Sequence, residues 1–132
     1  MSDSEKYCLK LEKCECGSPV LPDLSYEEQF AGYHDIDGNK VYVKTIDLGS
    51  LPTTNGATKA ISVSDLNIKR MVNNVFYWIG TSNVYIGNTA HHSVNSLALY
   101  YNHVTKEITV MARGSFGPLT GTVTIYYTRT DR

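Results

Sequence analysis

Apolar and polar residues alternate near the end of the chain as a half-buried strand requires. In residues 122–128 (TVTIYYT), Val123, Ile125 and Tyr127 occupy one side, while the threonines and Tyr126 occupy the other, because successive side chains of a strand point to opposite faces. β-Branched and aromatic residues favour strands. The pattern therefore predicts a terminal strand that lies inside a sheet.

Similar short segments recur at regular spacing after residue 24, and turn-forming residues separate them. Many short strands without a 3.6-residue apolar period predict an all-β fold, an antiparallel β-sandwich or jelly roll of about eight strands. The most apolar segment, residues 71–79 (MVNNVFYWI), is expected to be central in its sheet. The expected strands are residues 26–34, 40–48, 59–63, 71–79, 83–86, 94–101, 107–113 and 120–128.

Turn chemistry supports this order of strands. Asp37 and Gly38 lie between two strand-like runs, and the Asp-Gly pair predicts a hairpin with a primed turn and a positive φ at the glycine. Residues 102–106 are predicted to be the loop of a second hairpin, and residues 64–70 could form a single helical turn.

Residues 1–24 differ from the rest because eight of them are charged and two prolines end the segment. We predict an N-terminal attachment arm and connector at residues 1–24, followed by a β-sandwich domain at residues 25–132. A short strand in the arm could add to the sheet of a partner protein through main-chain hydrogen bonds. The expected contact residues are Tyr7, Leu9 and Leu11.

Composition excludes several classes of protein. The net charge is −1, whereas nucleic-acid proteins usually carry a basic face. No apolar run approaches the roughly 20 residues that a membrane helix needs. The three cysteines all lie within the first 16 residues, which is not a disulfide framework and fits synthesis in a reducing cytoplasm.

The residues that could bind a metal ion do not form a recognisable motif. Structural zinc sites usually show paired C-x-x-C knuckles, which the cysteines lack, so we expect free or partner-buried thiols. Asp35 and Asp37 suggest a calcium loop, but the glycine is fourth rather than sixth. The histidines are expected in surface loops, with ligation across a symmetry axis as the alternative. These candidates are Cys8, Cys14, Cys16, His34, His91, His92 and His103. We predict no metal and no cofactor.

Catalytic signatures are also lacking. Acidic residues are sparse after residue 28, and Gly114-Ser115-Phe116-Gly117 does not have the spacing of a nucleophile elbow. No phosphate-binding loop is present. The chain is therefore not expected to be an enzyme, and no catalytic residue is predicted.

Aromatic residues are the remaining candidates for function. The chain has ten tyrosines, three phenylalanines and one tryptophan, more rings than a small core needs. One interpretation is an exposed aromatic surface on which sugar rings stack, and the other is a core and a subunit interface filled by these rings. The candidate surface residues are Tyr77, Trp78, Tyr85, Tyr100 and Tyr126.

The segment YEEQFAGYHDIDGNKVYVKTIDLGSLPTT resembles the module that opens many small phage and prophage virion domains. The last strand resembles their "VTIEYTKT" ending, with Tyr126 at the position that is usually acidic. Many of those domains have a tryptophan before the turn, where this chain has Tyr33-His34. The resemblance covers residues 25–132. The matching positions are Tyr26, Gln29, Gly32, Asp37, Gly38, Lys40, Tyr42, Lys44, Thr45, Ile46, Leu51 and Pro52.

These residues make the chain similar to the C-terminal domains of tail-fibre, tail-tip and head-fibre proteins. The resemblance implies a receptor-binding-like β-sandwich, commonly trimeric, on the surface of a virion assembled in the host bacterial cytoplasm. It implies contact with a host glycan or protein receptor and mounting on a capsid or tail protein through residues 1–24. The alternatives are a purely structural head-fibre or decoration protein and a free-standing carbohydrate-binding module. No nucleic acid and no membrane insertion are expected.

Overall fold

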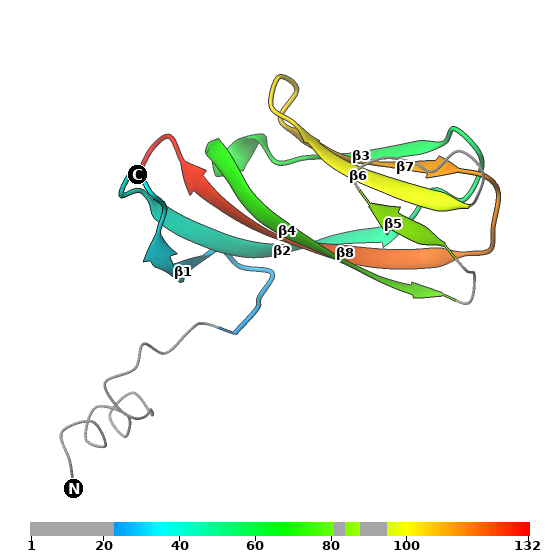
Figure 1. The fold of residues 1–132 in the computed structure, drawn as a ribbon, viewed down its shortest axis with the longest axis horizontal. Helices are drawn as coiled ribbons and strands as arrows, with labels where there is room; N and C mark the ends of the chain where they lie inside the picture. Colours follow the sequence, from blue (N-terminus) through cyan, green and yellow to red (C-terminus); the bar gives the residue numbers. More distant parts are fainter. Residues whose placement is uncertain (1–22, 81–83, 88–94) are drawn as a thin grey trace, which may run out of the picture.

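The computed structural model describes residues 23–80, 84–87 and 95–132, and within these ranges the chain forms two packed β-sheets (Figure 1). The predicted all-β, sandwich-like fold is confirmed. The described elements are β1 (Gln29–His34), β2 (Lys40–Ser50), β3 (Thr58–Ser62), the 3₁₀ turn η1 (Ser64–Leu66), β4 (Ile68–Gly80), β5 (Tyr85–Gly87), β6 (Ser96–Asn102), β7 (Glu107–Arg113) and β8 (Leu119–Arg129).

Strand β8 is central in the first sheet, which we call sheet A and which has the order β1-β2-β8-β4. All pairings in sheet A are antiparallel, and Val123 of β8 lies between Ile46 of β2 and Phe76 of β4. The second sheet, sheet B, has the order β3-β7-β6-β5, with the short strand β5 parallel to β6. The prediction that the terminal strand lies inside a sheet is therefore confirmed.

The main hydrophobic core fills the space between the facing sides of the two sheets. From β8, Val123, Ile125 and Tyr127 are fully buried, as the alternation in the sequence predicts. Sheet B contributes apolar side chains of β6 and β7, among them Leu97 and Val110. Burial of these β-branched and aliphatic groups is the main stabilising contribution to a fold of this size.

A second, smaller cluster lies on the outer side of sheet A. Val41 and Val43 alternate with the core residue Tyr42, yet they are also buried, against Ala31 and the half-buried Tyr126. The strand β2 is therefore buried on both sides along this part of its length. Alternation alone would have placed one of these sides in solvent.

The most apolar segment of the sequence is not central, contrary to the prediction. Strand β4 is an edge strand of sheet A, and it pairs with β8 alone among the described strands. Most of its side chains are exposed. The central positions of both sheets belong instead to β2, β8, β7 and β6.

The predicted hairpin at Asp37 and Gly38 is present between β1 and β2, but its turn is not primed. Gly38 has the expected positive φ of 84°. The two central residues, Ile36 and Asp37, do not have positive φ, and the amide of Gly38 donates to the carbonyl oxygen of Asp35 at 3.0 Å. The geometry is that of an ordinary β-turn followed by a left-handed glycine.

The side chain of Asp35 fixes this turn. Its Oδ1 accepts hydrogen bonds from the backbone amides of Asp37 and Asn39, each at 2.9 Å. The predicted loop at residues 102–106 has a similar device, because Oδ1 of Asn102 accepts the amides of Val104 and Thr105. Within residues 64–70, the predicted helical turn is present as η1.

Replacement of Gly38 by valine is expected to lower the free energy of unfolding by about 1–2 kcal/mol, because a β-branched residue is strained at positive φ. A Cβ at this position would have no atom within 4 Å, so the cost comes from the backbone alone. Gly38→Asn is the control, since asparagine tolerates this conformation, and it should lose much less. Equal melting temperatures for the two variants in thermal unfolding would contradict the assigned turn.

Candidate functional site

A row of threonines runs along β8 on the side of sheet A that faces away from sheet B. Thr120, Thr122 and Thr124 alternate with core residues, and the row spans roughly 13 Å at the rise of an extended strand. Thr45 of β2 lies opposite Thr124, and their hydroxyl oxygens are 2.8 Å apart. Thr124 is buried, so the outer side of sheet A presents the hydroxyl groups of Thr120 and Thr122, and no charge, along β8.

Three adjoining hollows follow this row, and together we call them the threonine trough. A cavity of about 270 Å³ and one of about 110 Å³ share Tyr77 and Thr122 as lining residues. The smaller cavity shares Ile79 and Thr120 with a third, of about 500 Å³, which reaches Phe116. The shared residues place the three cavities one after another along β8 and beside β4, and the third reaches the core residues Leu51 and Leu119.

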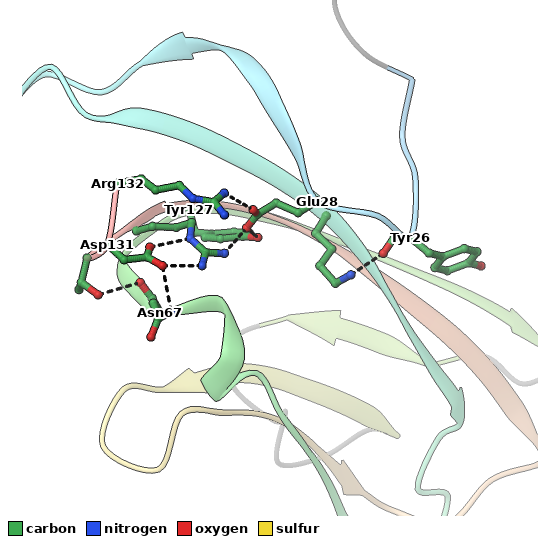
Figure 2. A network of polar contacts seen from close by, with 9 residues as sticks. Tyr26, Glu28, Asn67, Tyr127, Asp131 and Arg132 are labelled. Carbon is green, nitrogen blue, oxygen red and sulfur yellow. Dashed lines mark hydrogen bonds and ion pairs between the residues drawn. The ribbon is translucent and has the colours of Figure 1, made fainter.

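Tyr26 forms one wall of the trough, and two contacts to β2 hold its backbone in place. The carbonyl oxygen of Ser25 accepts the amide of Thr45 at 2.8 Å, and the ammonium of Lys44 donates to the carbonyl oxygen of Tyr26. Figure 2 shows the Tyr26 ring pointing away from the charged cluster around Glu28. The ring is 59% exposed and lines the same cavity as Tyr77.

Strand β4 forms the opposite wall and also a free apolar edge. Val75, Tyr77 and Ile79 share the outer side of sheet A, and Trp78 lies on the other side of the strand, opposite Gly121 of β8. All four of these β4 side chains are exposed. An exposed, long and apolar edge strand is a surface on which another chain can pack or pair.

The predicted aromatic surface is not assembled as a single platform. Tyr77 and Tyr126 lie on the outer side of sheet A, but Tyr126 packs into the small cluster with Val41 and Val43. Tyr100 lies on β6 of the other sheet, and the side chain of Tyr85 is outside the described residues. Of the five candidates, Tyr77 and Trp78 line the trough, and Tyr77 lies on the side of the threonine row.

The sequence analysis missed Tyr26 as a site residue. It was expected at the start of the first strand, whereas β1 begins at Gln29. The sequence holds one indication that this segment packs against the domain, because Leu24 and Tyr26 are apolar residues on either side of Ser25, directly before two glutamates. Nothing in the sequence, however, places this segment over Thr45 and Thr122.

The metal candidates are not brought together in the described part of the chain. His34 lies on β1 with its ring 5.7 Å from that of Phe30, and His103 lies in the turn between β6 and β7. His91, His92 and the predicted arm contacts Tyr7, Leu9 and Leu11 are outside the described residues, as are the three cysteines. Within residues 23–80, 84–87 and 95–132, no three His, Cys, Asp or Glu side chains group as metal ligands.

A polar network joins the start and the end of the sandwich, and Glu28 is at its centre (Figure 2). One carboxylate oxygen of Glu28 accepts from the hydroxyl of Tyr127 and from Nη1 of Arg129 at 2.6 Å, and the other accepts from Arg132 at 2.8 Å. Arg129 also forms two 2.8 Å hydrogen bonds to the carboxylate of Asp131. The network ties the segment before β1 to the end of β8.

The network changes the acidity of its carboxyl groups. Burial alone would raise the pKa of Glu28, but hydrogen bonds from Tyr127 and Arg129 and the charges of Arg129 and Arg132 hold the pKa below its ordinary value. The hydrogen bond from Arg129 is the main cause that lowers the pKa of Asp131 to about 2. Each group has partners that satisfy its charge, so the network is a structural clasp rather than a reactive site.

No family model, curated protein or solved structure matches the chain. The helical part of the described residues is the three-residue turn η1, and no helix there is long and apolar enough to cross a membrane.

Replacement of Glu28 by glutamine is expected to lower the free energy of unfolding at neutral pH by about 1–3 kcal/mol, because it leaves the nearly buried Arg129 without one of its anionic partners. A carboxyl group whose pKa is lower in the folded state stabilises the fold above its unfolded-state pKa, and this contribution is lost as the pH falls through the folded-state pKa. Wild-type stability should therefore decline on acidification from about pH 4.5 towards about pH 2.

Denaturant unfolding at several pH values checks this expectation. The decline with acidification should be smaller in Glu28→Gln than in wild type. Glu27→Gln, which changes the exposed neighbouring residue, is the matched control and should behave like wild type. A pH profile that is the same in all three proteins would contradict the role of Glu28.

Proposed function

We propose that this chain is a phage virion structural protein, displayed on the head or tail as a homotrimer. Residues 1–24 mount it on another virion protein, and the β-sandwich contacts a host-surface glycan or protein receptor. It acts by binding and not as an enzyme, and it belongs to the virion after assembly in the host bacterial cytoplasm. The single observation that carries the proposal is the exposed apolar strand β4, with the threonine trough beside it.

The four described sheet edges differ in how well they resist association. Strand β5 has three residues and β3 has five, while β1 is interrupted by a register shift between Phe30 and His34. Short and irregular edges of this kind discourage pairing with other chains. Strand β4 has thirteen residues and regular pairing from Asn73 to Gly80, so it is the edge most suited to a subunit contact.

Charge supports a second copy of this chain as the partner of β4. The segment from Met71 to Gly80 carries no charged side chain, so identical copies can approach without repulsion between like charges. The exposed side chains of Val75 and Trp78 would lose contact with water in such an interface, while the Tyr77 ring stays open at the trough. Around a threefold axis they would pack by their apolar groups, whereas direct strand pairing would give a twofold dimer.

The sequence resemblance supplies the virion context. The hairpin turn and the final strand that carry the resemblance form β1, β2 and β8, three of the four strands of sheet A. The segment that precedes residue 24 would reach the partner protein, and residues 24–26 lie directly at the trough. The attachment to the virion protein and the contact with the host receptor would therefore lie at the same end of sheet A.

The trough also favours a second candidate, a free-standing carbohydrate-binding module. Its exposed Tyr26 and Tyr77 rings and its hydroxyl-lined floor fit a sugar ligand without any need for a virion. This candidate differs in two measurable ways. It requires a monomer, and it does not require residues 1–24.

The mass of the purified protein in solution tests the subunit contact. Light scattering is expected to give three times the chain mass of 14.7 kDa, and Val75→Lys should reduce it to one chain mass, because the charge cannot be buried in an apolar interface. Val104→Lys, in an exposed turn, should remain trimeric. A wild-type monomer would contradict the proposal, and a dimer would indicate pairing of β4 edges in place of a trimer.

Deletion of residues 1–20 tests the mount. The shortened chain should keep its far-ultraviolet circular dichroism and melting temperature, because the described sandwich begins after this segment. Phage particles purified from a bacterium that makes the full chain should contain it. Particles purified from a bacterium that makes the shortened chain should lack it. Particles that contain both forms equally, or a shortened chain that does not fold, would refute the role of the arm.

A further inference from the structure

We propose that the threonine trough binds a neutral, extended oligosaccharide. The inference rests on the proposed function, since it identifies which class of host-surface molecule the sandwich contacts and where. It places the site on the face of sheet A, with Tyr26 and Tyr77 as the walls and the outer threonines of β8 as the floor.

The hydroxyl groups of the floor that other described residues do not use are those of Thr120 and Thr122, whereas Thr124 is 1% exposed. Thr124 and Thr45 share a hydrogen bond at the inner end of the trough. Thr122 is half-buried and Thr120 is exposed, and neither makes a side-chain hydrogen bond to another described residue. A threonine hydroxyl both donates and accepts, so this row can exchange hydrogen bonds with the hydroxyl groups of a sugar chain along its length.

The walls offer aromatic ring faces that suit the apolar C–H face of a sugar. Tyr26 and Tyr77 line the same cavity of about 270 Å³, and both rings are at least half exposed. A pyranose ring has a face of C–H groups, and burying that face against an aromatic ring removes apolar surface from water on both sides. The backbone contacts of Ser25 and Tyr26 to β2 hold the first ring in position before the ligand arrives.

The charges around the trough select against acidic ligands. Asp47 is the charged residue that lines it, and one of its carboxylate oxygens accepts the amide of Gly49 at 2.9 Å. Two lysines lie beside lining residues, and both ammonium groups donate to backbone: Lys44 to the carbonyl oxygen of Tyr26, and Lys59 to that of Ser50 at 2.9 Å. No basic side chain lines the three cavities, so a carboxylate or phosphate on the ligand would find no counter-charge and would meet Asp47.

The position of the trough also argues against a peptide ligand. Extended peptides usually gain affinity by main-chain hydrogen bonds to a free sheet edge. The trough lies over β8, whose backbone pairs with both β2 and β4. Side-chain hydroxyls and rings are therefore the groups that the ligand meets, and a sugar chain matches them along its whole length.

Binding of the full-length protein to defined probes tests the inference. Cellohexaose, maltohexaose and hexa-N-acetylchitohexaose are the neutral probes, and hexagalacturonic acid is the acidic probe, each titrated by calorimetry and by NMR chemical shifts. At least one neutral probe should bind more tightly than the acidic one. Tyr26→Ala should weaken that binding about tenfold or more, and Thr122→Val, which keeps the shape but removes the hydroxyl, should weaken it several-fold.

Tyr100→Ala is the matched control, because Tyr100 is also an exposed tyrosine, at 44% against 59% for Tyr26, but lies on sheet B. It should bind the probe like wild type, and all variants should keep the wild-type melting temperature and mass. The inference is overturned if no neutral probe binds, if the acidic probe binds more tightly, or if Tyr26→Ala and Thr122→Val bind like wild type. Binding that appears only after deletion of residues 1–20 would assign the trough to the chain's own N-terminal segment.

These outcomes separate the inference from the proposed function. If the protein is present in purified particles and trough variants adhere to host cells as well as wild type does, the assignment of the sugar site to the trough is wrong and the proposed virion function stands. If trough variants lose probe binding but the protein is absent from the particles, the sugar site stands and the virion function is wrong.

Discussion

The pairing of β8 on both of its edges is the interaction on which the rest of the structure depends. Eleven residues of the chain end form this strand, with β2 on one side and β4 on the other. Apolar and polar side chains alternate along β8, so Val123, Ile125 and Tyr127 enter the core while the threonines lie on the opposite side of the sheet. At its last residue, Arg129 reaches Glu28 and thereby fixes the segment that leads to Tyr26. The core, the trough and the clasp thus share one strand.

Because β8 and β2 occupy the centre of sheet A, the apolar strand β4 is left at the edge. The side chains of Val75, Tyr77 and Ile79 lie on the outer face of sheet A, which sheet B does not cover, so they remain exposed. This arrangement gives up burial within one chain and leaves apolar surface for contact between chains. The same strand forms a wall of the trough, which places the proposed subunit contact and the proposed ligand site next to each other.

The sequence predicts the elements better than their arrangement. Local alternation and turn residues identify strands such as residues 107–113 and the terminal strand, because those signals arise from neighbours in the chain. The edge position of β4 could not be inferred, since an apolar run indicates burial whether another strand or another subunit provides it. The primed turn was wrong because Asp35 caps an ordinary turn with its own side chain.

The candidate site shows the same limit. Tyr77 and Trp78 were identified from composition, but Tyr100 lies on sheet B and Tyr126 packs into the small cluster, because pairing order decides which face each ring joins. Tyr26 and Thr122 are 96 positions apart in the sequence and line one cavity. Only the path of the segment before β1 across β2 brings them together. Long-range placement of this kind depends on hydrogen bonds such as that from Thr45 to Ser25, which no local pattern encodes.

The central claim is that sheet A makes its contacts through the β4 edge. Hydrogen–deuterium exchange of the wild-type protein and the Val75→Lys variant, at equal concentration, tests it at the strand itself. The account predicts that amides of residues 73–80 exchange faster in the variant, while those of β3, the edge of the other sheet, exchange at the same rate in both. Equal protection of β4 in the two proteins would contradict the claim.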